Sequence, residues 1–327
     1  MRIAFSGIKG AYAETAAKLT FPGEEIISYS SFSRAYKAVS EGNCEFGILP
    51  IENSYAGDVS QVLDLLYFGN LGIVRVVEMP INHYLLGAEG TDIRKLKKVY
   101  SHPQALEQCK NYIEKAGYEI EAMSNTAVAA RTVATENDIT IAAIAGKETA
   151  ELYGLTILDS DIGDSPDNTT RFAVITKVSV ESNLCLRDKY PHNYTYLAPS
   201  DQVPTRSYEN RLAGLGSSGS YQEMSLSGSC SLSHLRSDAC HEFSLVFTVK
   251  DEAGALAKAV TAIGERGFNM KSIRSRPSKK ISWSYYFYVE GEGDMGVEEG
   301  RLLLKDLDEC CENVRIIGNY ECETIKR

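Results

Sequence analysis

The sequence predicts an α/β fold, with a larger domain of alternating strands and helices followed by a smaller ferredoxin-like domain. In residues 1–178, short apolar runs alternate with segments of helical length, which implies parallel strands joined by crossover helices. Residues 242–327 follow the order β-α-β-β-α-β, which is the ferredoxin-like arrangement. Residues 217–237 hold nine serines in 21 positions, so the intervening 179–241 is expected to be a Ser/Gly-rich linker or insertion.

The elements of the first domain follow from its hydrophobic runs and their periodicity. Strands are expected at residues 2–7, 46–52, 72–88 (one or two strands), 96–102, 118–124 and 139–145. Helices are expected at residues 13–20, 59–68, 103–117, 126–137 and 146–155. A last strand is expected to begin just after Thr170 and Arg171 and to return to the first lobe.

The second domain shows both periodicities. Strands are expected at residues 243–249, 270–277, 283–291 and 313–321, and helices at 254–267 and 296–311. In the first of these helices Leu256, Ala259, Val260 and Ile263 fall on one face. Because an open antiparallel sheet of this kind often pairs with a second copy, we expect a dimer.

The charge balance excludes several classes of partner. The chain has 34 basic and 44 acidic residues, a net charge of −10, and none of the three regions is net basic. A nucleic acid bound through its phosphates is therefore not expected, and an anionic small substrate must be held by helix N-termini or single arginines. No apolar run is long enough to cross a bilayer, and residues 1–14 lack the features of a secretory signal. We expect no membrane partner and a cytoplasmic location.

Eight cysteines are scattered through the chain, and free thiols are the expected state. The sole cluster of cysteines and histidines in the sequence comprises Cys230, His234, Cys240 and His241. Its spacing matches no standard zinc pattern, so no metal site is expected.

Polar residues follow a buried strand in the segment ILPIENSYAG, residues 48–57. The strand delivers Glu52, Asn53 and Ser54 to its carboxyl end, where open α/β sheets place their ligands. Gly57 then permits a tight turn into a helix whose free N–H groups can hold a carboxylate. An ordinary helix cap supplied by Asn53 or Ser54 explains the same pattern equally well.

The segment YSHPQALEQCK, residues 100–110, repeats this arrangement. Ser101 could cap the helix that begins near Pro103, contact a ligand, or do both. Gln108 offers an amide further along the helix, and His102 is a titratable candidate that could instead simply pack at the turn. Cys109 is interpreted as a small buried residue, because no activating base is adjacent.

Two further segments bring polar groups to the edge of an element. In SNTAVAA, Asn125 and Thr126 stand at a helix start. In DNTTRFAVI, Thr170 and Arg171 precede the returning strand. Arg171 is either a partner for a substrate carboxylate or part of a structural salt bridge.

Taken in order, these four segments closely resemble the prephenate dehydratase family through PIENSxxG, SHPQALxQC, NTAxAA and NxTRF. The resemblance extends to GIKGAYAETAA and AAIAGKETAELYGLTIL and covers essentially all of residues 1–178. Further along, GALAKAV (254–260) and IRSRP (273–277) resemble an ACT regulatory domain with the phenylalanine-site motifs of this family.

The resemblance implies a bilobed catalytic domain, similar to a periplasmic binding protein, with its active site between the lobes. The implied reaction converts prephenate to phenylpyruvate in L-phenylalanine biosynthesis, with loss of carbon dioxide and water. Since aromatisation drives the reaction, neither cofactor nor metal is expected. The implied catalytic residues are Thr170, which bears the catalytic hydroxyl, and Asn53, Ser101 and Gln108, which orient the substrate and polarise the departing oxygen. The implied substrate-binding residues are Glu52, Ser54, Thr126 and Arg171.

The ACT motifs imply regulation by phenylalanine bound between the ACT domains of a homodimer or homotetramer. The implied effector-binding residues are Gly254, Ala255, Leu256 and Ser275. Ala11 and Ala13 stand where the family usually has hydroxyl residues, Ala257 where it usually has valine, and Arg274 where it usually has glutamate. Two alternatives stay open. An arogenate dehydratase is one, because no residue decides between the two substrates. A non-catalytic ligand sensor is the other, which Ala11, Ala13 and Arg274 motivate, although a sensor would not need the whole catalytic set.

Overall fold

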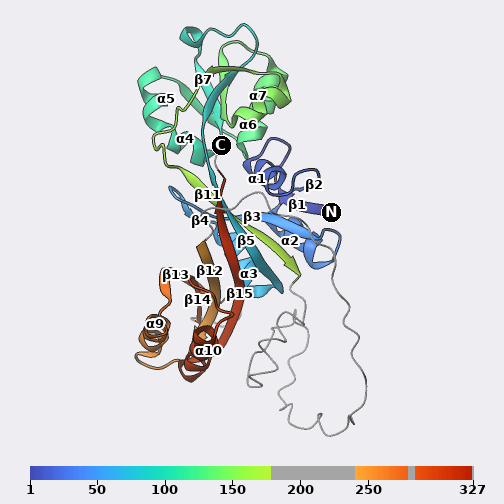
Figure 1. Ribbon diagram of the computed structural model, residues 1–327. Coiled ribbons are helices and arrows are strands. Elements are labelled where there is room, and N and C mark those ends of the chain that lie inside the picture. The colour runs from blue at the N-terminus through green and yellow to red at the C-terminus, as the bar shows by residue number, and fades with distance from the viewer. Residues whose placement is uncertain (178–239, 279–283, 326–327) are drawn as a thin grey trace.

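The computed structural model of this chain describes residues 1–177, 240–278 and 284–325 (Figure 1). The expected linker lies outside the described residues, apart from positions 240 and 241, and so do Cys230 and His234. Within the described residues, no helix is long and apolar enough to cross a membrane.

The first lobe is built on a large mixed sheet. Its elements are β1 (Arg2–Ser6), α1 (Tyr12–Thr20), β2 (Glu25–Tyr29), α2 (Phe32–Ser40), β3 (Phe46–Asn53), β4 (Gly57–Asp58), α3 (Ser60–Phe68), β5 (Leu71–Pro80) and β11 (Thr169–Lys177). Strand β1 pairs in parallel with β3, as the alternation of strands and helices predicted. It also pairs in parallel with β2, which, like α2, was not expected from the sequence. Strand β11 lies antiparallel between β3 and β5, which makes the sheet mixed.

Strand β11 begins earlier than the sequence analysis expected. Thr170 and Arg171 lie inside it, and the pairing of Thr170 with Asn53 on β3 and Met79 on β5 shows why. At Thr170, β3 and β5 still have backbone N–H and C=O groups that need hydrogen-bond partners. The polar segment therefore pairs with both strands and becomes part of β11. As consecutive strand residues, Thr170 and Arg171 must face opposite sides of the sheet.

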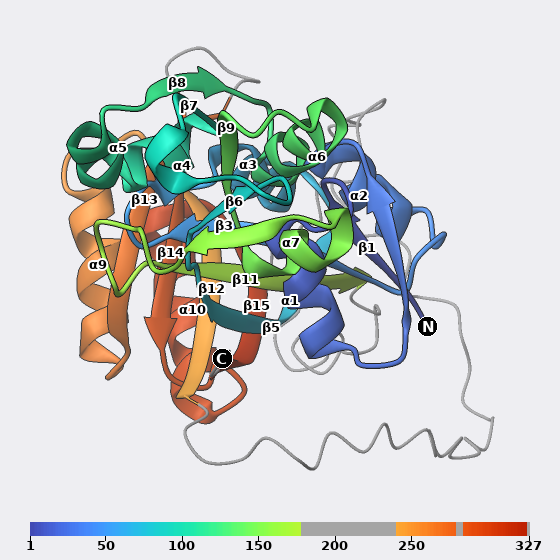
Figure 2. The ribbon, with the colours of Figure 1, turned by 90° about the horizontal axis from the view of Figure 1, so that it is seen from above.

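The second lobe has its own sheet, with the strand order β10-β6-β9-β7-β8. Its elements are β6 (Tyr84–Gly87), a 3₁₀ turn (Ile93–Lys95), β7 (Lys98–Ser101), α4 (Pro103–Gln108), α5 (Lys110–Ala116), β8 (Glu119–Ala122), α6 (Thr126–Glu136), β9 (Ile141–Ala145), α7 (Lys147–Tyr153) and β10 (Thr156–Asp159). The chain crosses between the lobes twice, at residues 81–83 and 160–168. Seen from the second-lobe side, α4 to α7 lie in front of the large sheet (Figure 2).

The helix expected at 103–117 is broken at Cys109 into α4 and α5. Cys109 has φ −119° and ψ 20°, outside the helical region. The Gln108 carbonyl accepts the Asp164 amide at 2.7 Å, and the Asp164 carboxylate accepts the Asn111 amide at 3.1 Å. The crossing segment thus satisfies backbone groups on both sides of the break, which an uninterrupted helix would have paired internally.

The C-terminal domain has the expected order of elements. These are β12 (Cys240–Val249), α9 (Ala255–Glu265), β13 (Asn269–Pro277), β14 (Tyr285–Glu292), α10 (Glu298–Cys310) and β15 (Cys311–Thr324). Strand β15 pairs in parallel with β5, so the sheet runs without a break as β13-β14-β12-β15-β5-β11-β3-β1-β2. Backbone hydrogen bonds between β15 and β5 therefore join the C-terminal domain directly to the first lobe.

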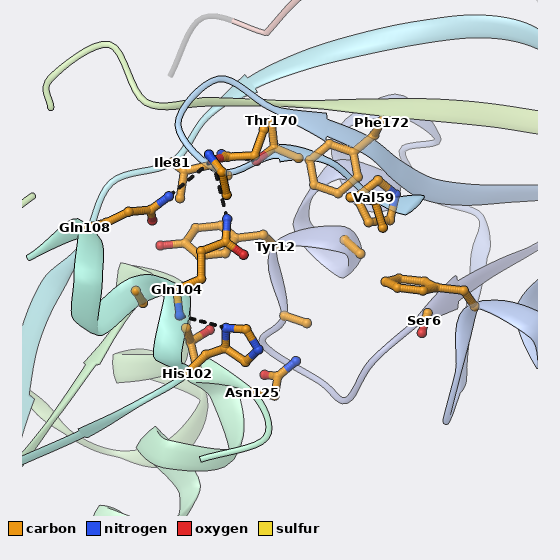
Figure 3. Close-up of a pocket in the computed structure, with 18 of the residues that line it drawn as sticks. Ser6, Tyr12, Val59, Ile81, His102, Gln104, Gln108, Asn125, Thr170 and Phe172 are labelled. Carbon is orange, nitrogen blue, oxygen red and sulfur yellow. Dashed lines mark hydrogen bonds between the residues drawn. The ribbon is translucent and has the colours of Figure 1, made fainter. Parts of the chain in front are cut away.

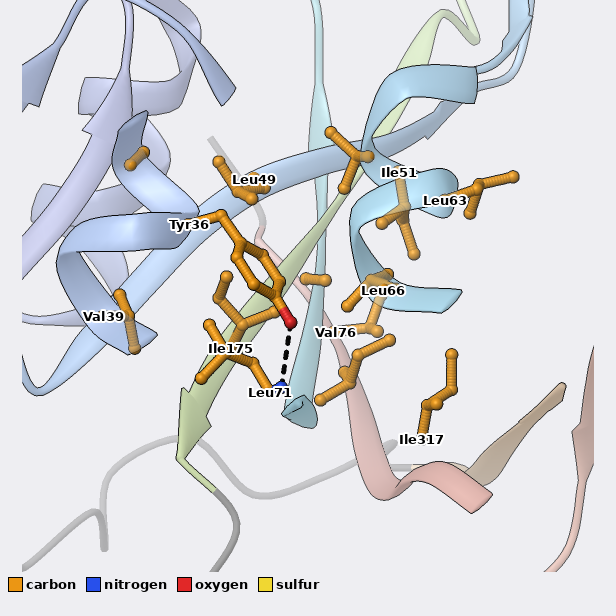
Figure 4. Packing of buried hydrophobic residues seen from close by; sticks show 14 of the residues in the cluster. Tyr36, Val39, Leu49, Ile51, Leu63, Leu66, Leu71, Val76, Ile175 and Ile317 are labelled. Atoms are coloured by element: carbon orange, nitrogen blue, oxygen red, sulfur yellow. Dashed lines mark hydrogen bonds between the residues drawn. The ribbon is translucent and has the colours of Figure 1, made fainter. Parts of the chain in front are cut away.

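One apolar core is shared by both domains. Tyr36, Leu49 and Val76 of the first lobe are buried in the same cluster as Ile317 of β15 (Figure 4). Tyr320 of β15 belongs to this cluster as well. The Tyr36 hydroxyl also accepts the Leu71 amide at 2.9 Å. Because this cluster belongs to both domains, separating them would expose apolar surface to water.

The junction also includes α3 and the face of the C-terminal sheet that lies away from α9 and α10. The Tyr286 ring stacks on Tyr67 of α3 at a centroid distance of 3.6 Å. Arg315 of β15 donates to the Gly69 carbonyl at 2.5 Å, immediately after α3 ends. These contacts place the C-terminal domain against the first lobe.

Candidate active site

A cleft of about 670 Å³ lies between the two lobes and holds several of the predicted site residues (Figure 3). Asn53 and Thr170 come from the first lobe, and Gln108 and Thr126 from the second. Its other lining residues include Ala11, Tyr12, Ala13, Asp58, Val59, Ser60, Ile81, His83, His102, Gln104, Asn125 and Phe172. The structure thus brings together four segments that are far apart in the sequence.

Asn53 is the polar centre of this cleft and is 5% exposed. Its Oδ1 accepts the Tyr55 and Ala56 amides at 3.1 and 2.9 Å, so the side chain closes the turn that follows β3. The same oxygen accepts the side-chain amides of Gln104 at 3.4 Å and Gln108 at 3.2 Å. Asn53 therefore ties the turn of the first lobe to helix α4 of the second.

The Thr170 hydroxyl lies at the cleft wall on the other side of Asn53. Asn53 Nδ2 donates to Thr170 Oγ1 at 3.0 Å, to Asn168 Oδ1 at 2.8 Å and to the Thr169 carbonyl at 3.1 Å. Since Thr170 Oγ1 accepts this bond, its own proton remains available to donate to a bound ligand. The arrangement suits a weak acid that must hydrogen-bond to a developing negative charge.

No lysine or arginine is among the described residues that line the cleft. Two helices begin there without a side-chain cap, α1 after Ala11 and α3 after Val59. Because no region of the chain is net basic, helix N-termini were expected to hold an anionic substrate. The first N–H groups of α1 and α3 are donors of this kind. Burial lowers the pKa of His83 and of His102, so both imidazoles are neutral near pH 7.

Two predicted residues lie behind the cleft wall. Ser101 is fully buried, and its hydroxyl donates to the Ile144 carbonyl at 2.6 Å, which links β7 to β9. Ser54 Oγ accepts the Thr169 amide at 2.9 Å on the solvent side of the turn. Neither lines the cleft. Cys109 is fully buried, and burial raises the pKa of its thiol to about 12, which leaves it in the unreactive protonated form.

Glu52 and Arg171 lie on the opposite face of the sheet, at the junction with the C-terminal domain. Arg171 forms an ion pair with Glu290 at 2.8 Å and a shorter one with Glu242, both on C-terminal strands. Glu52 forms an ion pair with Arg274 at 2.7 Å. Of the two alternatives left open for Arg171, the geometry matches the structural salt bridge.

Arg274 also lies in this junction. Its guanidinium contacts Asp58 as well as Glu52, and it is 3.4 Å from Glu290. The next residue, the predicted effector residue Ser275, is exposed on the other face of β13. Gly254 caps α9 with a positive φ of 87°, followed by buried Ala255 and half-buried Leu256. The charge of Arg274 is therefore directed at the catalytic domain and away from the face of Ser275.

His83, Gln104 and Tyr12 line the cleft but were not predicted as site residues. His83 Nε2 lies 2.8 Å from Gln108 Oε1, and the Tyr12 hydroxyl donates to the Asn82 carbonyl at 2.6 Å. His83 follows Asn82 in the otherwise largely apolar stretch MPINHYLLG, where a titratable side chain was the available signal. Gln104 lies one helical turn before Gln108, which places both amides on one face of α4.

Fold and cleft together define a bilobed α/β enzyme with a small C-terminal ferredoxin-like domain. The family model for prephenate dehydratase matches residues 3–180, and the model for the ACT domain matches residues 243–309. The chain belongs to the prephenate dehydratase family and ends in an ACT domain. The predicted family, the α/β fold class and the assignment as a dehydratase are thereby confirmed.

Curated relatives cover nearly all of the chain. A protein named prephenate dehydratase from Methanocaldococcus jannaschii is 34% identical over 95% of this chain and 95% of its own length. A protein named arogenate dehydratase/prephenate dehydratase 2, chloroplastic, from Arabidopsis thaliana is 32% identical over 99% of this chain and 74% of its own length.

Solved structures show the same fold. The prephenate dehydratase of Arthrobacter aurescens in complex with L-Phe has a TM-score of 0.73 at 23% identity, covering 98% of this chain and 89% of its own. GqqA, described as a novel type of quorum-quenching acylase, has a TM-score of 0.75 at 25% identity, covering 98% of both chains.

Proposed function

We propose that this chain converts prephenate to phenylpyruvate, carbon dioxide and water. The observation that carries the proposal is the Thr170 hydroxyl, which accepts from Asn53 at 3.0 Å and keeps its own proton for the cleft. In a family of dehydratases, that proton has one evident use, which is to hydrogen-bond to the departing hydroxyl of the substrate.

The reaction needs little acid strength. The bond from the ring carbon to its carboxylate breaks, and the electron pair moves into the ring. The ring C–O bond breaks on the opposite side, and hydroxide leaves and is protonated to water. Aromatisation provides the driving force, so the cleft has to orient the dianion and stabilise the departing oxygen, and no cofactor is required.

The substrate carboxylates are assigned to the uncapped starts of α1 and α3. Because His83 and His102 are neutral, they do not offset the charge of a bound dianion. Its binding is favourable only if peptide N–H groups and helix dipoles replace the water that solvates it. Thr126, at the start of α6 and in the cleft lining, is assigned to substrate binding with Asn53 and Gln108. Ser101 supports β7 from behind, and Ser54 shapes the turn after β3.

Prephenate is preferred over arogenate in this proposal. Arogenate carries an ammonium group where prephenate carries a keto group, and an ammonium favours a carboxylate nearby. Asp58 is the one acidic residue among the described residues of the lining, and it is paired with Arg274. A neutralised Asp58 gives arogenate no advantage.

Phenylalanine is the proposed effector, acting through the ACT domain. The Arthrobacter aurescens neighbour was solved with L-Phe, and this chain has a glycine at the start of α9 and an exposed Ser275 on β13. We assign the effector to Gly254, Ala255, Leu256 and Ser275, between the ACT domains of a homodimer or homotetramer. We also propose a cytoplasmic location and a division of the chain into a catalytic domain (1–178), a linker or insertion (179–241) and an ACT domain (242–327).

The test is steady-state turnover of the full chain on prephenate and on arogenate, in EDTA, with and without phenylalanine. We expect phenylpyruvate from prephenate, a lower kcat/KM with arogenate and a response to phenylalanine. An acylase assay on the same preparation checks the activity in the description of GqqA. Tight prephenate binding without turnover would support the sensor alternative, and light scattering would give the oligomeric state.

A further inference from the structure

We propose that His83 is a positioning residue for the dehydration. It begins a one-way series of hydrogen bonds, from His83 to Gln108 to Asn53 to Thr170, that helps to hold the Asn53 amide against Thr170 and so directs the Thr170 proton. The proposal rests on the function proposed above and extends it to a residue that the sequence motifs did not mark. His83 is 2% exposed and lies in the first segment that crosses between the lobes.

Backbone groups identify which atom of the Asn53 amide is the oxygen and which is the nitrogen. Its Oδ1 faces two peptide N–H groups, of Tyr55 and Ala56, which can only donate. Its Nδ2 faces the Thr169 carbonyl at 3.1 Å, which can only accept. The two ends of the Asn53 amide are thus distinguished, although oxygen and nitrogen are similar in shape.

The orientation of Gln108 then follows from Asn53. The Gln108 atom 3.2 Å from Asn53 Oδ1 must be a donor and is therefore Nε2, so Oε1 is the atom 2.8 Å from His83. A carbonyl oxygen at that distance requires a proton on His83 Nε2. Neutral His83 therefore carries its proton on Nε2 and leaves Nδ1 on the side of the Tyr12 hydroxyl, 3.5 Å away.

The second crossing segment holds the first two members of the series in place. The Ile162 amide donates to the His83 carbonyl at 3.1 Å, and the Asp164 amide donates to the Gln108 carbonyl at 2.7 Å. His83 lies between the lobes, Gln108 in the second lobe and Asn53 in the first. The series is therefore complete only when the two lobes hold this relative position.

The consequence for the reaction lies at the last bond. Every member donates toward Thr170, so the Thr170 oxygen accepts and its proton is directed away from Asn53, into the cleft. If His83 Nε2 did not donate, Gln108 could rotate its amide. Asn53 Oδ1 would then lose one of its four hydrogen-bond donors, and the Asn53 amide would be held less firmly against Thr170. The effect should appear in the chemical step more than in substrate binding, since His83 acts through Gln108.

Three substitutions test the role of the Nε2 proton. The amide nitrogen of glutamine can occupy the position of Nε2, whereas that of asparagine corresponds to Nδ1. We expect His83→Phe and His83→Asn to lower kcat for prephenate about ten-fold with KM within about two-fold, and His83→Gln to keep most of kcat. Thr20→Val, which removes a buried hydrogen bond to the Ala16 carbonyl away from the cleft, serves as the control and should leave kcat unchanged.

A second measurement does not depend on how the variants fold. Two-bond ¹H–¹⁵N correlation spectra of the full wild-type chain report the tautomer of each histidine, and the His83→Gln spectrum assigns the signal. We expect His83 to be protonated on Nε2. Protonation on Nδ1, or wild-type kcat in folded His83→Phe, would overturn the proposal. Absence of turnover by the wild-type chain would instead count against the proposed function, and the tautomer would still test the hydrogen-bond series.

Discussion

Asn53 and Thr170 face each other on adjacent strands and are joined by a 3.0 Å hydrogen bond at the floor of the cleft. Their chain neighbours Glu52 and Arg171 also face each other, 3.7 Å apart, but on the opposite side of the sheet. Because side chains alternate along a strand, one pair of strands presents a neutral polar pair to the cleft and a charged pair to the ACT domain. A shift of β11 relative to β3 would move both pairs at once.

Replacing the Thr170 hydroxyl tests the first of these pairs. Thr170→Val keeps the shape of the side chain but removes the donor, and we expect kcat to fall at least about 100-fold, as for loss of a group that assists proton transfer. Thr170→Ser, which retains the hydroxyl, should keep a substantial part of the activity. Steady-state kinetics on both variants, with circular dichroism to verify folding, decides the matter. Comparable activity in Thr170→Val and wild type would exclude the assigned role.

The motif pattern of the sequence, through its resemblance to the dehydratase family, located Asn53, Gln108, Thr126 and Thr170, all of which line the cleft. It also predicted the α/β class and the β-α-β-β-α-β order of the second domain. The same reasoning could not separate Thr170 from Arg171, because it started the strand after both residues. Had the strand been started at Thr169, alternation alone would have directed the two side chains to opposite faces.

Residues that act through tertiary contacts were beyond the reach of the sequence. His83 has no motif of its own, and its role depends on Gln108, which is 25 residues away. Similarly, the sequence marked Arg274 only as a departure from the glutamate that is usual in the effector motif. Its partners are Glu52 and Asp58, more than 200 residues earlier in the chain. A pairing over such a distance follows from the joining of β15 to β5, which no local pattern encodes.

Restoring the family's glutamate at position 274 should destabilise this chain. Arg274→Glu places a carboxylate beside Glu52, Asp58 and Glu290, and Glu290 is 2% exposed. We expect the free energy of unfolding to fall by roughly 3 kcal/mol, as for loss of the cation from a largely buried ion-pair cluster. Denaturant titration of the full chain measures the change.

Lys305→Glu is the matched control for this substitution. It makes the same change from cation to carboxylate at an exposed position of α10. We expect a change within about 0.5 kcal/mol, as for an exposed surface position. Equal losses in the two variants would show that Arg274 does not stabilise the junction through these carboxylates.

The uncapped start of α1 offers a stabilising substitution. Ala11 has the extended backbone of a helix N-cap, with φ −67° and ψ 148°, but has no side-chain acceptor. Ala11→Ser supplies a hydroxyl oxygen for the first-turn amides and should raise the free energy of unfolding by about 1 kcal/mol. Ala13→Ser, which adds a hydroxyl inside the first turn, should not. A thermal or denaturant midpoint that rises equally in both variants would exclude capping as the cause.

The two cleft histidines should make stability depend on pH below neutrality. Burial lowers the pKa of His83 and of His102, so below about pH 6.5 the unfolded chain binds protons that the folded chain does not. The free energy of unfolding should therefore fall as the pH falls from about 6.5 toward the folded pKa values. Protonation of His102 would also abolish its acceptance of the Gln104 amide at Nδ1, a 3.2 Å bond that caps α4. Denaturant titrations between pH 5 and pH 7.5 cover roughly the range over which histidine changes charge. The free energy of unfolding should depend less steeply on pH in His83→Gln than in wild type. The dependence should be weaker still in the double variant with His102→Gln. An unchanged slope in the double variant would mean that other groups set the acid sensitivity of the fold.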